Sequence, residues 1–413
     1  MKKTLLTLML FVFTFSNAQM VSTIAGSGNQ QTTDGTGITA SFNRPNGIVK
    51  DSNGNLFVAE ENGFVIRKIA PNGVVTTFAG NGTNGFLDAT GTAAIFANLG
   101  ALAIDNQNNI YVGDFGNSRI RKITPSGVVT TLVTIDNPYG ICIDPAGTNL
   151  YAVGQSRRVF KVEIATGQIT LIAGNSSQGN TDGIGTNASF NLPFGVVVDP
   201  TNTYLYVSDF SNNNIRRVTL ATTQVSQFAG SGNSNFADGT GSAASFNAPI
   251  GMQCDSSGNI YLADHYNNRI RKITPNAVVT TVAGSANFGG ADGPALSAEF
   301  STPLGVFLDN NGDLFVTEYD GNKVRKVSSV ALNSSEFQTN NLKLNLYPNP
   351  ASDILNIETE NELKSVEIYS IQGQKVLSAV SKEINISNLT SGLYLVQVTD
   401  IDDIIATQKL IIK

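Results

Sequence analysis

The residues with the greatest capacity for chemistry in this chain are acids that recur at the ends of short apolar segments, as in LFVAE and IYLAD. Carboxylates that meet at one place can act as general acids and bases, and their oxygens suit Ca²⁺. The same acids could instead pair with arginines that recur after them. The acids are Glu60, Asp114, Asp209, Asp264 and Glu318. The arginines are Arg67, Arg121, Arg216, Arg271 and Arg325.

Other catalytic patterns are sparse. The chain has one histidine, His265, so a histidine-rich zinc site is excluded, and we expect His265 on a surface loop. No Ser-His-Asp or Cys-His arrangement follows from the spacing, and no glycine loop leads from a strand into a helix to bind phosphate. The two cysteines, Cys142 and Cys254, fall at equivalent positions of non-adjacent repeats. We therefore expect buried free thiols rather than a disulfide.

An internal repeat must position these residues. One six-residue segment recurs six times along the chain with small changes in sequence. The six versions are VSTIAG (21–26), VTTFAG (75–80), VTTLVT (129–134), ITLIAG (169–174), VSQFAG (225–230) and VTTVAG (279–284). Gly is abundant at 40 residues and charged residues are only 14%, a composition that suits short strands joined by tight turns.

Each repeat holds four strand-like pieces rich in Val, Ile and Tyr. In one repeat they are Ile250–Asp255, Ile260–Asp264, Arg269–Thr274 and Val278–Ala283. Four antiparallel strands per repeat describe a blade of a β-propeller, so the sequence predicts an all-β, six-bladed propeller.

The last repeat ends after its third strand, Lys323–Val327. We predict that Val21–Ala25 supplies the missing fourth strand. Pairing of these two segments would close the ring and remove its exposed sheet edges.

Segments such as RPNGIVKDSNGNLFVAEENGFVIRKI and PIGMQCDSSGNIYLADHYNNRIRKI resemble NHL repeats. The resemblance recurs in register over roughly residues 20 to 330. The third repeat is degenerate, because it lacks a long insertion and reads YAVGQSRRVFKV. Among similar propellers, some lyases hold zinc with several histidines, and lactonase-like enzymes bind calcium at the channel. This chain lacks the histidines for such a zinc site, but its recurring acids could serve as calcium ligands.

Loops after the second strand and residues before the first strand fall on the same face of such a blade. Aromatic side chains gather at these positions and could stack on sugar rings or grip a peptide. An equally weighted alternative is that several of them pack against the long insertions. The predicted ligand-binding residues are Phe115, Tyr139, Phe194, Phe210, His265, Tyr266 and Tyr319.

The long insertions share an aspartate and a later phenylalanine. This regular recurrence favours a structural role, with the acid capping a turn and the ring plugging the space between blades. On the opposite face, turns such as Asp309–Asp313 are read as hairpin turns rather than calcium loops. The insertion acids are Asp34, Asp88, Asp182, Asp238 and Asp292, and the rings are Phe42, Phe96, Phe190, Phe246 and Phe300.

The N-terminal 18 residues have the features of a secretory signal peptide. Lys2 and Lys3 precede an apolar run, Leu5–Phe15, and Ser16-Asn17-Ala18 supplies small residues for cleavage before Gln19. The run is too short to span a bilayer, and we expect no transmembrane span. The net charge of −6 gives no basic surface for nucleic acid.

After a polar segment at 331–343, seven short strand-like pieces indicate a small Ig-like β-sandwich at 344–413. Its words YPNPASDIL, SGLYLVQV and QKLIIK resemble the type IX secretion system (Por secretion system) C-terminal sorting domain. That resemblance implies the type IX machinery as a partner and a secreted or outer-membrane cell-surface location. The motif residues are Pro348, Asn349, Pro350, Gly392, Tyr394, Lys409 and Lys413.

The predicted organisation is a signal peptide at 1–18, the propeller at 19–330, a linker at 331–343 and the sorting domain at 344–413. The sequence favours a binding module for an extracellular glycan, peptide or protein, with no catalytic or metal-binding residues and no required cofactor. The alternative is a propeller hydrolase or lyase that uses the recurring acids at the channel mouth, with calcium as the ion they would suit.

Overall fold

The computed structural model describes residues 19–328, 344–359, 362–370, 375–401 and 405–412. The chain divides into two compact units, Met1–Ala331 and Leu332–Lys413. The expected signal peptide and linker, and Lys413, lie outside the described residues.

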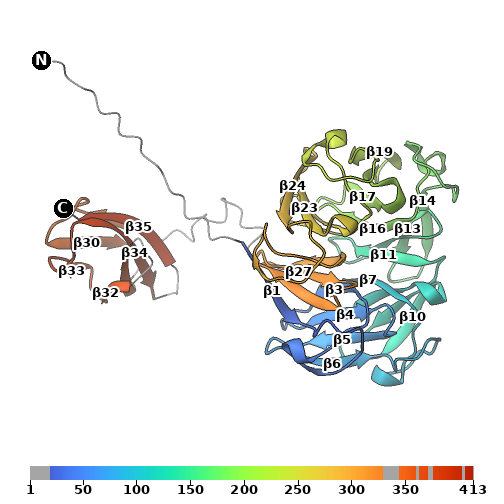
Figure 1. The fold of residues 1–413 in the computed structure, drawn as a ribbon, viewed down its shortest axis with the longest axis horizontal. Coiled ribbons are helices and arrows are strands. Elements are labelled where there is room, and N and C mark those ends of the chain that lie inside the picture. Colours follow the sequence, from blue (N-terminus) through green and yellow to red (C-terminus); the bar gives the residue numbers. More distant parts are fainter. Residues whose placement is uncertain (1–18, 329–343, 360–361, 371–374, 402–404, 413) are drawn as a thin grey trace, which may run out of the picture. The chain divides into compact units, whose positions relative to one another are not determined.

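In the described part of the first unit, the strands form six antiparallel sheets that follow one another around a ring (Figure 1). The innermost strand of each sheet contacts the innermost strand of the next sheet, and β26 contacts β3, so the ring is closed. These innermost strands are β3 (Pro45–Lys50), β7 (Leu99–Ile104), β11 (Pro138–Ile143), β16 (Pro193–Val198), β21 (Pro249–Cys254) and β26 (Pro303–Leu308). This arrangement confirms the propeller fold.

The remaining strands of each sheet follow outward in chain order. The second strands are β4 (Leu56–Glu60), β8 (Ile110–Asp114), β12 (Asn149–Gly154), β17 (Tyr204–Asp209), β22 (Ile260–Asp264) and β27 (Leu314–Glu318). The third strands are β5 (Val65–Ile69), β9 (Arg119–Ile123), β13 (Val159–Glu163), β18 (Asn214–Thr219), β23 (Arg269–Ile273) and β28 (Lys323–Val327). The fourth strands are β6 (Val74–Ala79), β10 (Val129–Thr134), β14 (Ile169–Ala173), β19 (Gln224–Ala229), β24 (Val278–Ala283) and β1 (Met20–Ala25).

Short elements complete the blades. Two-residue strands pair with four of the outer edges, namely β2 (Gly35–Thr36), β15 (Gly183–Ile184), β20 (Gly239–Thr240) and β25 (Gly293–Pro294). Single 3-10 turns lie in the insertions at η1 (Gly37–Thr39), η2 (Gly91–Ala93), η4 (Gly185–Asn187) and η6 (Gly241–Ala243). Others follow second strands at η3 (Phe115–Asn117), η5 (Phe210–Asn212) and η7 (His265–Asn267).

Ring closure occurs as the sequence predicts. Strand β1 pairs antiparallel with β28, with Val21 opposite Val327 and Thr23 opposite Arg325. Figure 1 shows the dark blue N-terminal strand beside the orange strands of the last blade. The first and last residues of the propeller are thus held in one sheet.

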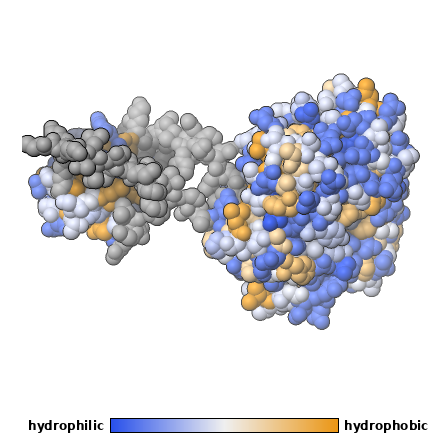
Figure 2. All heavy atoms as spheres, turned by 45° about the horizontal axis from the view of Figure 1, so that its top comes forward, coloured by the Kyte–Doolittle hydropathy of each residue, from blue (hydrophilic) through white to orange (hydrophobic). Residues whose placement is uncertain are grey.

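Glycines allow the innermost strands to approach closely. A Cβ atom at Gly195 would lie 1.9 Å from the carbonyl oxygen of Ile250 on the next sheet, a distance that no real side chain permits. The outer surface, by contrast, is largely polar with scattered apolar patches (Figure 2). Its exposed apolar residues include Ile38, Ile184, Phe288 and Leu296 of the insertions.

The second unit contains two sheets around a buried apolar core. One sheet is formed by β29 (Leu344–Tyr347), β30 (Ile354–Thr359) and β33 (Glu383–Asn385). The other is formed by β31 (Leu363–Ser370), β32 (Lys375–Ala379), β34 (Gly392–Asp400) and β35 (Ile405–Ile412).

The three sequence motifs of this unit meet at β35. The Asn349 side chain donates to the Lys409 carbonyl (2.6 Å) and accepts from the backbone N–H of Ile411 (2.9 Å), so the segment containing Pro348 and Pro350 is tied to the last strand. Gly392 and Tyr394 of β34 lie opposite residues of the same strand.

The closing strand gives the first prediction. Val21 is 1% exposed and packs in a cluster with residues of the last two blades. We expect Val21→Ala to lower the free energy of unfolding by about 2 kcal/mol, because it leaves a cavity at the closure. Chemical denaturation followed by circular dichroism measures this, since the chain lacks tryptophan. The exposed neighbour Ser22 provides the control variant Ser22→Ala, and equal effects of the two substitutions would contradict the closure.

Candidate functional site

The five recurring acids are fully buried within the blades rather than presented at the channel mouth. Each makes an ion pair with the recurring arginine of its own sheet. The N–O distances are 2.6 Å for Glu60–Arg67, 2.8 Å for Asp114–Arg121, 3.2 Å for Asp209–Arg216, 2.6 Å for Asp264–Arg271 and 2.7 Å for Glu318–Arg325. Burial raises the pKa of all five carboxyls, and the facing arginine opposes that rise.

The same arginines also hold the long insertions. The second nitrogen of each guanidinium pairs with the insertion aspartate, as in Arg271–Asp238 at 2.7 Å. The insertion phenylalanine lies under the guanidinium, with Phe246 centred 5.3 Å from Arg271. All five of these phenylalanines are fully buried. The recurrence in the insertions therefore has a structural role, as the sequence predicts, but the aspartate pairs with the arginine of its blade instead of only capping a turn.

The degenerate third blade shows that these groups form one unit. Phe160 stands at the arginine position of this blade, and Gly154 stands at the acid position. The long insertion is missing from the same blade. Arginine, acid and insertion are thus lost together, as expected if each needs the others to be buried.

The seven predicted ligand-binding residues lie around one end of the central channel. Ring contacts connect them in a continuous arc. Centroid distances are 5.0 Å for Phe115–Tyr139, 4.5 Å for Tyr139–Phe194, 5.0 Å for Phe194–Phe210, 6.3 Å for Phe210–Tyr266, 4.7 Å for Tyr266–His265 and 6.4 Å for His265–Tyr319. We call this set the aromatic arc. It contains rings from sheets two to six.

Exposure varies along the aromatic arc. Tyr266 is 56% exposed, whereas Tyr139 is buried, and the phenylalanine rings and Tyr319 are half-buried. The expectation that His265 lies on the surface is wrong, because its side chain is only 6% exposed. Its Nδ1 lies 3.0 Å from the Pro303 carbonyl oxygen, and burial lowers its pKa. Tight packing beside Tyr266 encloses the imidazole in a loop that the sequence places outside.

A polar group from the first blade fills the gap between the two ends of the aromatic arc. The Glu61 carboxylate accepts hydrogen bonds from the Tyr319 hydroxyl (3.1 Å), the Asn46 amide (3.1 Å) and the Tyr139 hydroxyl (3.4 Å). Arg44 donates to the Tyr319 hydroxyl at 3.0 Å. We call Arg44, Asn46 and Glu61 the polar gap.

Burial sets the protonation of this group. It raises the pKa of Glu61, while the hydrogen bonds from Tyr319, Asn46 and Tyr139 oppose the rise. Burial also raises the pKa of Tyr319 to about 12, so the phenol stays protonated and donates. The channel end therefore offers flat apolar rings beside an accepting carboxylate and a guanidinium.

The sequence interpretation missed Arg44 and Glu61 as site residues. A signal for Glu61 was present, because the equivalent position in the other blades holds Phe115, Gln155, Phe210, His265 or Tyr319, none of them acidic. Arg44 gives no such signal, since it precedes a strand in a variable loop.

We searched the described residues for clusters of metal ligands and for membrane-spanning helices. No group of three or more His, Cys, Asp or Glu side chains there is placed to hold a metal ion. No helix among these residues has the length and apolarity needed to cross a bilayer.

Comparison with known proteins agrees with this architecture. A model of the teneurin NHL domain matches residues 88–289, and a model of the secretion system C-terminal sorting domain matches residues 345–413. The fold and these two matches define an exported β-propeller protein. More particularly, the chain is an NHL-type propeller with a type IX sorting domain, and this domain directs export to the cell surface or beyond.

Two curated relatives are similar to this chain over most of its length. Protein SUPPRESSOR OF QUENCHING 1 of Arabidopsis thaliana is 28% identical over 346 residues, which cover 80% of this chain and 29% of that protein. Teneurin-1 of Homo sapiens is 28% identical over 300 residues, which cover 67% of this chain and 9% of that protein. The chain therefore spans less than a third of the length of either relative.

Solved structures share the fold. A protein of unknown function from Bacteroides thetaiotaomicron has a TM-score of 0.63 at 24% identity and covers 75% of this chain and 76% of its own. A protein called an auxiliary nutrient binding protein from the same species has a TM-score of 0.61 at 19% identity, with the same coverage.

The buried arginines give the second prediction. Arg271→Met leaves the buried Asp264 without its charged partner, so we expect the free energy of unfolding to fall by about 3–5 kcal/mol. The adjacent, half-buried Lys272 supplies the control Lys272→Met, for which we expect less than about 1 kcal/mol. Denaturation curves of both variants measure the difference. Similar small effects would show that the ion pair does not hold the blade.

Glu61 gives a prediction about pH. Because its folded-state pKa is raised, the folded protein binds more protons than the unfolded chain above the ordinary carboxyl pKa of 4.5. The stability of the wild type should therefore fall as pH rises from 4.5 through the raised pKa. Glu61→Gln cannot titrate and should lack the part of this fall that Glu61 causes, whereas the other buried carboxyls titrate in both proteins. The stability of the variant relative to wild type should therefore increase across that window. Denaturation of both proteins at pH values from 4 to 8 tests this, and a constant difference would contradict it.

Proposed function

We propose that this protein is a secreted or cell-surface binding module that holds a glycan on the channel end formed by the aromatic arc and the polar gap. The observation that supports this proposal is that the aromatic arc and the polar gap lie side by side on one end face of the propeller. Flat aromatic rings bind the apolar faces of sugar rings, and carboxylate, amide and guanidinium groups bind sugar hydroxyls. One face therefore offers both contacts that a sugar needs.

The recurring acids favour binding over catalysis. A hydrolase or lyase on this end face would need several free carboxylates, but the five recurring acids are engaged by arginines within the blades. Glu61 is held by three donors of the binding face itself. We therefore assign these acids to structure and Glu61 to ligand recognition.

The comparisons offer limited support. Two structural neighbours, from Bacteroides thetaiotaomicron and Bacteroides ovatus, are called auxiliary nutrient binding proteins. Their identities to this chain are 19% and 18%, so the likeness extends to the fold. Export by the type IX system would bring such a module into contact with extracellular polysaccharide.

A glycan array, followed by calorimetry with each bound glycan, tests the proposal on the purified protein beginning at Gln19. We expect Phe194→Ala and Phe210→Ala each to weaken binding about tenfold, because each removes a stacking surface. Glu61→Gln should weaken binding by a similar factor through lost hydrogen bonds to hydroxyls.

Phe288→Ala is the matched control. Phe288 is 64% exposed on an insertion and belongs to neither the aromatic arc nor the polar gap. Unchanged binding by this variant, with loss in the others, would support the proposal. Absence of any bound glycan would refute the glycan assignment and direct the same variants to a peptide array, with and without calcium.

A further inference from the structure

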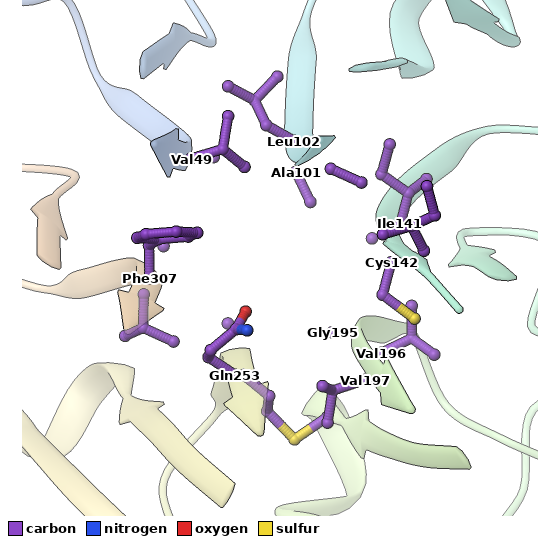
Figure 3. Close-up of a pocket in the computed structure, with 18 of the residues that line it drawn as sticks. Val49, Ala101, Leu102, Ile141, Cys142, Gly195, Val196, Val197, Gln253 and Phe307 are labelled. Carbon is purple, nitrogen blue, oxygen red and sulfur yellow. The ribbon is translucent and has the colours of Figure 1, made fainter. Parts of the chain in front are cut away.

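The central channel forms a cavity of about 430 Å³ between the innermost strands. This volume lies within the range of pockets that bind small molecules. Figure 3 looks into the cavity and shows side chains from several blades around a common opening. Asn46, Tyr139 and Phe194 of the binding face border one end of this space, and the rest of its wall belongs to the innermost strands and their turns.

The cavity is closed at one end and open at the other. At the end beneath the aromatic arc, Tyr139, Ile250 and Leu304 form a buried apolar cluster that seals the channel. At the opposite end, Asn106, Pro145 and Ser256 belong to the tight turns and are exposed, so a ligand would enter from that face. The two sites are therefore reached from opposite sides of the propeller.

Apolar side chains form the larger part of the cavity wall, and backbone and a few polar side chains form the rest. Aliphatic and aromatic side chains such as Val49, Ile141 and Phe307 surround the opening. Two acids, Asp144 and Asp255, lie among the lining residues near the open end. Their carboxylates already accept hydrogen bonds from their own turns, as in Asn149 Nδ2 to Asp144 at 2.7 Å and Asn259 Nδ2 to Asp255 at 2.8 Å. No lysine, arginine or histidine lines the described cavity, so an anion would find no counter-charge.

One amide gives the wall a directed polar group. The Gln253 side chain extends from β21 toward the middle of the channel (Figure 3). It makes no hydrogen bond with another described residue, although its backbone pairs normally with Tyr261. The side chain is half-buried, so its amide remains available to exchange a hydrogen bond with a molecule in the cavity.

We propose that the channel is a second ligand site, for a small, uncharged and largely apolar molecule that exchanges a hydrogen bond with Gln253. The apolar wall excludes charged ligands, the sealed end limits length, and Gln253 orients the one polar group of the ligand. The two sites meet at Asn46, Tyr139 and Phe194, which border both, but the cavity is entered from the opposite face and Gln253 belongs to the cavity alone.

Both cysteines line this cavity and serve as native reporters. Cys142 on β11 and Cys254 on β21 are free and half-buried. The expectation of free thiols is confirmed, and the expectation that they are buried is corrected to half-buried, since both border the channel. Burial raises the pKa of Cys142 and raises that of Cys254 to about 12, so both react slowly at neutral pH. A bound molecule should slow them further.

The test titrates the purified protein beginning at Gln19 with N-phenyl-1-naphthylamine, a neutral apolar fluorophore with one N–H donor. We expect saturable binding of one probe per chain with enhanced, blue-shifted emission. Gln253→Leu should weaken binding about three- to tenfold, because it removes the hydrogen bond and keeps the volume. Gln253→Trp should abolish binding by filling the channel. The control Phe288→Ala should bind as wild type does.

Thermal unfolding by circular dichroism first establishes that each variant is folded. If Gln253→Trp fails to fold, protection of the two thiols in the wild type provides a second measurement. Saturating probe should slow modification of Cys142 and Cys254 by monobromobimane at least fivefold, as read by peptide mass spectrometry. Absence of saturable binding, unaltered binding in folded Gln253→Trp, or unprotected thiols would each overturn the proposal.

Discussion

The structure depends most on a buried arginine that recurs in five blades. Each guanidinium pairs with an acid at the end of the second strand and with an aspartate of the preceding insertion, and it lies over a buried phenylalanine. These contacts join the third strand, the second-strand loop and the insertion of a blade. Burying a charged group is costly unless an opposite charge pairs with it, so all members must be present together. The third blade, where Phe160 and Gly154 replace the pair, dispenses with the insertion as well.

This repeated unit leaves the inner end of each blade free to vary. The recurring acid pairs with the arginine, and the residue directly after the acid is not needed for this ion pair. Its type can therefore differ from blade to blade. Phe115, Phe210, Tyr319 and Glu61 occupy this position in different blades. Their differences create an asymmetric rim on a regular scaffold, with aromatic rings on most of its circumference and a carboxylate with a guanidinium in the gap. A constant framework with a variable rim is what a recognition surface requires.

The close approach of the innermost strands has a separate consequence. Glycines such as Gly195 bring neighbouring sheets together near the sealed end, where Tyr139, Ile250 and Leu304 meet. Beyond this seal the strands leave an apolar space with Gln253 and two thiols in its wall. The propeller therefore carries two chemically different surfaces, one polar and aromatic at its closed end, and one apolar inside.

The sequence by itself determined the repeat, the four-stranded blades, the closing strand and the sorting motifs, because each follows from local strand and turn patterns at a fixed period. It also grouped the aromatic residues correctly, since equivalent positions in a repeat must share one face. Only the tertiary structure decided which ionisable groups are buried. The recurring acids lie inside the blades, His265 is enclosed, and Glu61 is held by Tyr139 and Tyr319 from distant blades. Protonation and access depend on neighbours brought in by ring closure, and a linear pattern does not contain those neighbours.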